Sequence, residues 1–230
     1  MKKIIVLDTE GMSSHNPYNI GYVVADRNGN IYLERNFAYL PAIIENVIDC
    51  EPAKELVIRG ASEILETEKY FYVRDKQEIL NTLRNDIVEN KVSDIWAYNC
   101  SFDNRMLNKL FGAECIKELN ITFKCIWSAI VFSKLLSRNY FNFIEKNNYL
   151  TERGNPISKA EIVYRYLFNE NNFIEKHTAL EDSKIELSIL LKAFKTKKKL
   201  VWDCRQPWRI LKEKYDKEKR QTLSFYLPDR

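Results

Sequence analysis

The sequence predicts an α/β domain with a mixed, five-stranded sheet flanked by helices. Three strand-like segments open the chain, and Asn28-Gly29 between two of them signals an antiparallel hairpin. Further along the chain, helical patterns alternate with two short apolar runs. Antiparallel strands followed by alternating helices and strands are typical of a mixed sheet in an α/β domain.

The expected strands are short apolar runs bounded by polar or turn residues. They cover residues 3–9, 20–25, 31–37, 95–98 and 123–126. The segment 41–72 has no clear period, and we expect it to be helical in parts.

Caps and apolar stripes define the expected helices. Asp75 and Glu78 resemble a capping box ahead of an apolar stripe made of Ile79, Leu80, Leu83, Ile87 and Val88. Ser101 is the expected N-cap of the next helix, and Gly112 its expected end. That helix has the stripe Met106, Leu107, Leu110 and Phe111.

Three further helices are expected in the second half of the chain. One covers 128–136, one runs from a Ser158-x-x-Glu161 cap to about Phe168, and one runs from Thr178 to about Phe194.

Length and composition indicate an ordinary globular protein. With 230 residues, 45% hydrophobic, the chain suits one domain with a substantial core, or one domain plus an appendage. Its five cysteines lack any C-x-x-C pair, so we expect reduced thiols rather than disulfides or a zinc site. No N-terminal apolar stretch resembles a signal peptide or membrane span, so a cytoplasmic protein with no membrane partner is expected.

The charge is divided unevenly along the chain. Residues 195–230 hold 12 basic and 5 acidic residues, although the whole chain carries only +4. We therefore expect an acidic body, residues 1–194, and a basic C-terminal extension, residues 195–230. The extension could dock on the body, hold a nucleic-acid backbone or bind a protein partner.

Two carboxylates, Asp8 and Glu10, follow the apolar run of the first expected strand. Residues two apart on a strand share a face, so both side chains lie on the face of Ile4 and Val6. Two adjacent anions repel each other, and a divalent cation that prefers oxygen ligands, Mg²⁺ or Mn²⁺, would neutralise them. A strand end emerging into solvent would explain the same two residues.

Asp103 and Asp182 are further carboxylates at positions where the local pattern favours apolar residues. Asp103 lies four residues before Leu107, on the apolar stripe of its helix. With Thr178 as N-cap, His177 and Asp182 take the N′ and N4 positions, which usually carry two apolar side chains in contact. We therefore expect His177 and Asp182 to lie close together.

The chain carries three motifs in this order: LDTEG, YNCSFD and HTALED. As an ordered set they resemble the exonuclease motifs of the DEDD superfamily. A histidine five residues before the last aspartate marks the DEDDh branch, which includes oligoribonuclease and the proofreading exonuclease subunit of bacterial DNA polymerase. The resemblance covers about residues 3–194 and implies a ribonuclease H-like fold and 3′→5′ exonuclease activity on single-stranded nucleic acid. Tyr98 stands where several relatives have histidine.

The resemblance also implies roles for individual residues. Two divalent cations, Mg²⁺ or Mn²⁺, would be held by Asp8, Glu10, Asp103 and Asp182, with Asp8 bridging the ions. His177 would be the general base that accepts a proton from the attacking water. The implied substrate-binding residues are Thr9, Gly11, Met12, Asn99 and Phe102.

Three functions fit these observations. The first is a 3′→5′ exonuclease on single-stranded DNA, and the second is the same activity on RNA or oligoribonucleotides, where the 2′-hydroxyl is available for recognition. The third is a non-catalytic nucleic-acid-binding adaptor. Retention of four carboxylates and a histidine argues against the adaptor, which would have no chemical need for them.

Overall fold

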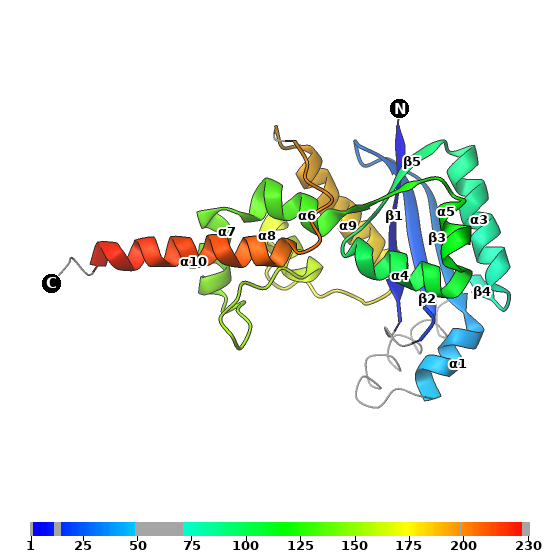
Figure 1. The fold of residues 1–230 in the computed structure, drawn as a ribbon, viewed down its shortest axis with the longest axis horizontal. Coiled ribbons are helices and arrows are strands. Elements are labelled where there is room, and N and C mark those ends of the chain that lie inside the picture. Colours follow the sequence, from blue (N-terminus) through cyan, green and yellow to red (C-terminus); the bar gives the residue numbers. More distant parts are fainter. Residues whose placement is uncertain (1, 12–14, 49–70, 198, 227–230) are drawn as a thin grey trace. The chain divides into compact units, whose positions relative to one another are not determined.

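The computed structural model describes residues 2–11, 15–48, 71–197 and 199–226, and Figure 1 traces their elements. The chain forms two compact units. The first, called the sheet unit, comprises Met1–Lys124 and Glu175–Ser188. The second, called the helical unit, comprises Cys125–Ile174 and Ile189–Arg230. The boundary expected at residue 194 stays a prediction.

A six-stranded mixed sheet, in the order β4-β3-β2-β1-β5-β6, forms the centre of the sheet unit. β1 pairs antiparallel with β2 and parallel with β5, and β3 pairs antiparallel with β2 and parallel with β4. The predicted α/β fold with a mixed sheet is thus confirmed. The strands are β1 (Lys3–Glu10), β2 (Asn19–Asp26), β3 (Ile31–Tyr39), β4 (Phe71–Val73), β5 (Val92–Ala97) and β6 (Thr122–Cys125).

β4 is one strand more than the five that the sequence predicts. It has three residues, too few for an apolar alternation to stand out from its surroundings. The expected helical part of segment 41–72 includes α1 (Leu40–Ile48), while residues 49–70 lie outside the described part of the chain.

The core of the sheet unit lies between β1 and two helices, α3 (Lys76–Glu89) and α4 (Cys100–Phe111). Ile5 and Leu7 belong to the same buried cluster as the apolar stripes of both helices. Their neighbours Ile4 and Val6 are buried outside that cluster, which agrees with the alternation of a strand. The face shared by Asp8 and Glu10 is therefore the one turned away from α3 and α4.

Capping explains where these helices start and stop. The Asp75 side chain accepts a hydrogen bond from the Gln77 N–H at 2.9 Å, so the predicted cap of α3 is confirmed. Gly112, with φ of 91°, ends α4 as predicted, and the short helix α5 (Ala113–Lys117) follows. The predicted N-cap Ser101 is wrong, because α4 starts at Cys100 and Asn99 is its N-cap residue.

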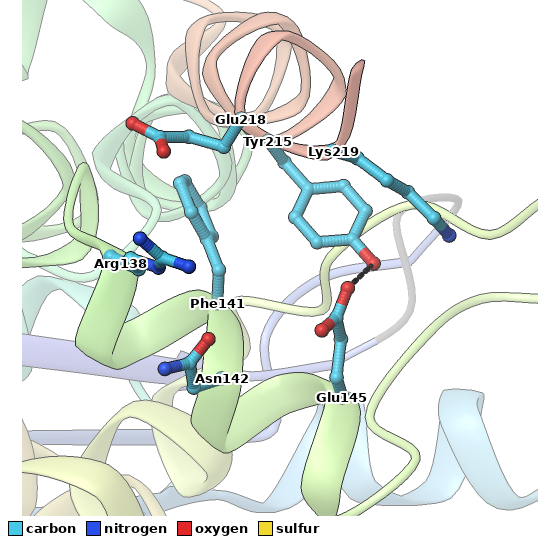
Figure 2. Close-up of a pocket in the computed structure, with 7 residues that line it drawn as sticks. All are labelled: Arg138, Phe141, Asn142, Glu145, Tyr215, Glu218 and Lys219. Atoms are coloured by element: carbon cyan, nitrogen blue, oxygen red, sulfur yellow. Dashed lines mark hydrogen bonds between the residues drawn. The ribbon is translucent and has the colours of Figure 1, made fainter. Parts of the chain in front are cut away.

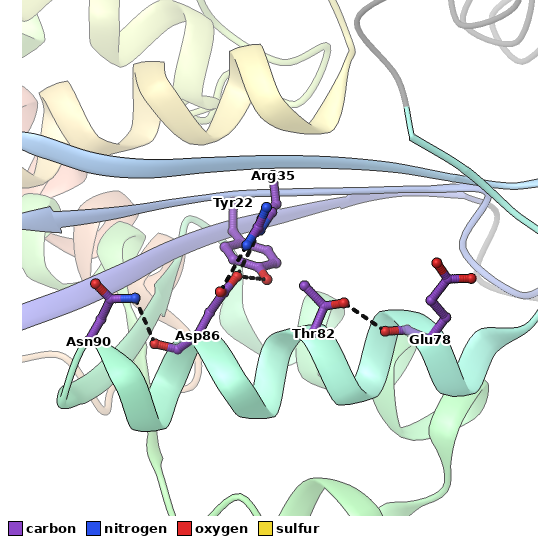
Figure 3. A network of polar contacts seen from close by, with 6 residues as sticks. All are labelled: Tyr22, Arg35, Glu78, Thr82, Asp86 and Asn90. Carbon is purple, nitrogen blue, oxygen red and sulfur yellow. Dashed lines mark hydrogen bonds and ion pairs between the residues drawn. The ribbon is translucent and has the colours of Figure 1, made fainter.

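The predicted stripe of α3 is correct except at its end. Val88 is 74% exposed, since the helix turns that position to solvent one residue after the buried Ile87. The polar Asp86 is buried on the core side instead, and Figure 3 shows how it is satisfied. Its carboxylate accepts hydrogen bonds from the Tyr22 hydroxyl at 2.7 Å and the Arg35 Nε at 2.9 Å.

The helical unit contains the helices from residue 126 on that precede and follow α9 (Ala179–Phe194) in the sequence. Ser158 is not a side-chain cap as predicted: it accepts a hydrogen bond from Trp127 Nε1, and Lys159 precedes the helix. α9 begins among residues of the sheet unit and ends among those of the helical unit. The elements from residue 126 on are α6 (Ile126–Ile130), the π-helix η1 (Val131–Leu135), α7 (Arg138–Lys146), α8 (Ala160–Phe168), α9 (Ala179–Phe194) and α10 (Pro207–Tyr226).

The basic extension packs through α10 within the helical unit. Leu211 and Tyr215 of this helix are 1% and 2% exposed, which supports the docking alternative for the extension. Trp208, near the start of the same helix, is 42% exposed. Figure 2 shows Tyr215 beside Phe141 of α7, with its hydroxyl donating to Glu145 at 2.8 Å. Among the described helices, none combines the length and apolar character needed to cross a membrane.

Candidate metal centre

The start of α9 rests directly on β2, opposite the two acidic residues of β1. Asp8 pairs with Gly21 and Glu10 with Asn19 in the antiparallel register. A Cβ on Gly21 would lie 2.1 Å from the backbone nitrogen of Leu180, so only glycine permits this approach. The fully buried Asn19 side chain accepts a hydrogen bond from the Ala179 N–H, the first N–H of the helix, at 2.8 Å.

This docking brings Asp182 and His177 to Glu10. One potential ligand atom from each of these three residues lies within 4.8 Å of the other two. His177 has φ of 56°, a left-handed backbone conformation uncommon outside glycine, immediately before the helix begins. The predicted proximity of His177 and Asp182 is therefore present in the structure.

Asp8 and Asp103 lie outside that group of three but act on it electrostatically. Burial raises the pKa of Asp8 well above its ordinary value, and the charges of Glu10, Glu186, Asp103 and Asp182 raise it further. Its Oδ2 is buried and has no hydrogen-bond partner among the described residues.

Asp103 is held in place by the strand that carries Asp8. Its Oδ1 accepts hydrogen bonds from the Thr9 N–H at 3.2 Å and the Thr9 hydroxyl at 2.9 Å. Asp103 is 2% exposed, and burial raises its pKa to about 7 although the Thr9 hydrogen bonds oppose the rise. The charge on the apolar face of α4 is thus a fixed part of the acidic cluster.

The remaining two carboxyls also favour their protonated forms. Burial raises the pKa of Glu10 to about 7, while a hydrogen bond with Asp182 opposes the rise. Burial raises the pKa of Asp182 to about 9, with Glu175 and then Glu10 adding to the effect. The Oδ1 of Asp182 is buried and, within the described ranges, has no hydrogen-bond partner.

Sequence reasoning missed a fifth acidic residue, Glu186. It is 4% exposed and lies one helical turn after Asp182 on α9. Burial raises its pKa well above the ordinary value, and Asp103 is the next largest cause. The i, i+4 spacing from Asp182 was the available signal, because such residues share one helix face.

The residues present fit a divalent cation. Two buried carboxylate oxygens, on Asp8 and Asp182, have no hydrogen-bond partner in the described part of the chain. Clustered carboxylates without a counter-charge are costly, whereas oxygen-rich sites of this kind suit Mg²⁺ and Mn²⁺. Asp8, Glu10, Asp103 and Asp182 would hold such ions, with His177 beside them.

Among the predicted substrate-binding residues, Thr9 and Gly11 lie at the end of β1, Asn99 follows β5, and Phe102 lies in the first turn of α4. Asn99 is exposed and its side chain makes no capping hydrogen bond. Phe102 is half-buried, and the Arg105 guanidinium lies over its ring at 5.5 Å. A Cβ on Gly11 would approach Pro17 to 2.9 Å, while the Thr9 side chain is engaged with Asp103. Met12 lies outside the described residues.

Comparison with known proteins identifies the fold. No protein-family model matches the chain, and no curated protein sequence does. Among solved structures, the chain is similar to E. coli Exonuclease I in complex with a dT13 oligonucleotide, with a TM-score of 0.50 and 13% identity. The match covers 91% of this chain and 43% of Exonuclease I.

The chain shares the fold of part of Exonuclease I. The predicted ribonuclease H-like architecture is thereby confirmed, and this chain spans less than half the length of Exonuclease I. The DEDDh branch and the likeness to the polymerase subunit stay predictions.

Proposed function

We propose that the protein is a metal-dependent 3′→5′ exonuclease that shortens single-stranded DNA. The observation that carries this proposal is the acidic cluster with His177 at its edge, on the fold of an exonuclease. The structure of Exonuclease I contains a dT13 oligonucleotide, which favours single-stranded DNA as the substrate. The position of His177 supports the DEDDh branch.

Four acidic residues form the metal site in this proposal. Asp8, Glu10, Asp103 and Asp182 would hold the cations, with Glu10 and Asp182 nearest to His177. When bound, the ions supply Lewis-acid stabilisation of the phosphodiester and activation of water. Thr9 keeps Asp103 in place through two hydrogen bonds.

His177 is the proposed general base. It lies beside Glu10 and Asp182, so it can accept the proton of a water held at that site. Its left-handed backbone turns the chain into α9, and this fixes the imidazole relative to Asp182. A strained backbone is retained where the surrounding structure over-determines it, which is frequent at functional sites.

The 3′-terminal nucleotide is proposed to lie against Phe102 and the backbone of Thr9, Gly11 and Met12. Phe102 is accessible enough to stack on a base, and stacking on aromatic side chains is tolerant of sequence. Asn99 has an amide free of capping bonds that can donate to the substrate.

A cleavage assay with the whole chain tests this function. The protein is incubated with 5′-labelled single-stranded DNA or RNA in Mg²⁺, Mn²⁺ or EDTA. We expect progressively shorter labelled DNA in either cation and intact DNA in EDTA. Faster shortening of RNA would assign the enzyme to RNA, and binding without cleavage in any cation would favour the adaptor.

A further inference from the structure

Glu186 is a buried acidic side chain that the three exonuclease motifs do not include. Acidic residues are almost never fully buried unless they are paired. Glu186 is nevertheless 4% exposed and adds to the negative charge around Asp8 and Asp103. Its position therefore needs a reason beyond packing.

The reason lies in one long-range hydrogen bond. The Oε2 of Glu186 accepts the backbone N–H of Tyr98 at 3.1 Å, across 88 residues of sequence. Tyr98 directly follows β5 and directly precedes Asn99, the N-cap residue of α4. The bond thus ties α9 to the connection between β5 and α4.

This connection determines where Asp103 lies. Asp103 is in the first turn of α4, a few residues after Tyr98. Its own carboxylate is fixed to β1 by Thr9, while Glu186 fixes the chain leading into its helix. Because Asp182 and Glu186 stand on the same helix, the bond also relates Asp103 to Asp182.

We propose that Glu186 is a positioning residue that anchors the β5–α4 connection to α9 and so sets Asp103 relative to Asp182. The proposal rests on the metal site proposed above and adds a residue to its support. The positioning role is assigned to Glu186 because its Oε2 accepts a backbone N–H of the β5–α4 connection, whereas the buried oxygens of Asp8 and Asp182 have no donor among the described residues. Partners that orient metal ligands typically change metal affinity about 10–100-fold when they are replaced.

Two substitutions separate the hydrogen bond from the charge. Glu186→Gln keeps the length and the acceptor oxygen but removes the charge. Glu186→Asp keeps the charge but withdraws the acceptor by one methylene. A matched control is Glu78→Gln, which removes one exposed charge from α3 in the same unit.

The test is calorimetric titration of each full-length variant with Mn²⁺, alongside thermal melts and steady-state cleavage of single-stranded DNA. We expect Glu186→Asp to weaken Mn²⁺ binding by about 10–100-fold and to lower kcat. Glu186→Gln should weaken binding by less than about 5-fold, which is below the usual range for a lost orienting partner. Glu78→Gln should match the unmodified protein.

The reverse order would overturn the proposal. If Glu186→Gln binds Mn²⁺ far more weakly than Glu186→Asp, the carboxylate acts as a ligand or through its charge. If both folded variants bind and cleave like the unmodified protein, Glu186 only fills space. An unmodified protein that binds no Mn²⁺ would instead refute the metal site itself, together with this inference.

Discussion

Asp8 and Asp182 each keep a buried carboxylate oxygen without a hydrogen-bond partner among the described residues. An unsatisfied buried polar group costs about 1–3 kcal/mol. A fold that retains two of them within one acidic cluster is less stable than it could be. A bound cation would offset that cost, and this is the physical link between the cluster and the proposed chemistry.

Asp8→Asn should abolish cleavage while leaving a folded protein. Removing one anion relieves repulsion in the cation-free state, so the Tm in EDTA should stay the same or rise. Cleavage should fall by about 10²–10³-fold or more, the scale expected when a key electrostatic group is lost. Mn²⁺ should raise the Tm of the unmodified protein and of Glu78→Gln but not that of Asp8→Asn. If Mn²⁺ raises the Tm of Asp8→Asn as much as that of the unmodified protein, the proposed role of Asp8 in holding the cations is contradicted.

His177→Ala should reduce kcat by about 10²–10⁴-fold, the usual scale for a lost general base. His177→Asn is the matched variant, because asparagine tolerates the left-handed backbone that the residue adopts. Both should still gain stability from Mn²⁺, measured as a rise in Tm. Loss of that gain in both variants would make His177 a ligand rather than the base.

The raised pKa values predict how stability without cations depends on pH. Burial raises the pKa of Glu10 and Asp103 to about 7 and that of Asp182 to about 9, all above their ordinary values. The folded state therefore binds more protons than the unfolded chain at any pH between the ordinary and the raised pKa values of these carboxyls. The stability these groups contribute is complete below their ordinary pKa values and is lost as pH rises through about 7 to about 9.

In EDTA, the Tm should accordingly fall between about pH 5 and about pH 9. Saturating Mn²⁺ should make this fall smaller, because bound carboxylates are stabilised as anions. Asp182→Asn in EDTA should show a shallower fall than the unmodified protein, since one carboxyl with a strongly raised pKa is gone. A cation-free Tm that rises over this range would mean that the carboxyls are not held together as described.

At the scale of elements, the site depends on the contact between β2 and the first turn of α9. Gly21→Ala would place a Cβ 2.1 Å from the Leu180 nitrogen, and the neighbouring Ala179 carbonyl carbon at 2.3 Å leaves no room either. Overpacking of this kind costs about 1–3 kcal/mol or more, and urea denaturation should measure the loss. Because α9 carries Asp182, Mn²⁺ affinity should fall as well. Unchanged affinity at wild-type stability would show that α9 is not fixed by this contact.

Local signals in the sequence predicted most elements and singled out the four carboxylates that are proposed to bind cations. The cap at Asp75, the end of α4 at Gly112 and the hairpin beside β2 are each determined by neighbouring residues, and all three are present. The caps expected at Ser101 and Ser158 are wrong, because α4 starts one residue before Ser101 and the Ser158 hydroxyl accepts a hydrogen bond from Trp127 Nε1. A short capping motif does not determine which hydrogen bond the serine side chain makes in the folded protein.

Other parts of the site could not be predicted because they depend on residues far apart in the sequence. Asn19 accepts a hydrogen bond from the Ala179 N–H, 160 residues away, and Glu186 accepts one from the Tyr98 N–H, 88 residues away. Gly21 is required because the backbone of α9 packs against it, and the sequence of β2 alone does not indicate that contact. These contacts position the predicted carboxylates, so the missed residues support the site rather than form its ligands.

At the scale of the whole molecule, the C-terminal extension contributes structure as well as charge. Cys125 N–H donates to the Trp202 carbonyl at 3.1 Å, and the Ser128 hydroxyl donates to the Val201 carbonyl at 2.8 Å. With Leu211 and Tyr215 buried, truncation after Thr196 would damage the helical unit. Charge substitutions on α10 are therefore the better test of nucleic-acid contact.

Arg209 and Lys217 are exposed, whereas Lys214 forms an ion pair with Glu218 at 2.7 Å. If the extension holds a nucleic-acid backbone, Arg209→Gln and Lys217→Gln should each weaken binding of long single strands. The slope of log K against log salt should become shallower by about 0.7 for each lost phosphate contact. Lys214→Gln is the control and should change the slope least. Equal, unchanged slopes in all three variants would leave the extension as packing or a protein-binding surface.

The most direct test of the central claim follows single-stranded DNA labelled at either end in Mn²⁺, with Asp8→Asn as the comparison. A 3′→5′ exonuclease predicts early release of a labelled mononucleotide from 3′-labelled DNA and a descending ladder from 5′-labelled DNA. Neither should form in EDTA or with Asp8→Asn. Internal cuts, a mononucleotide released first from the 5′ end, or equal cleavage by Asp8→Asn would contradict the account.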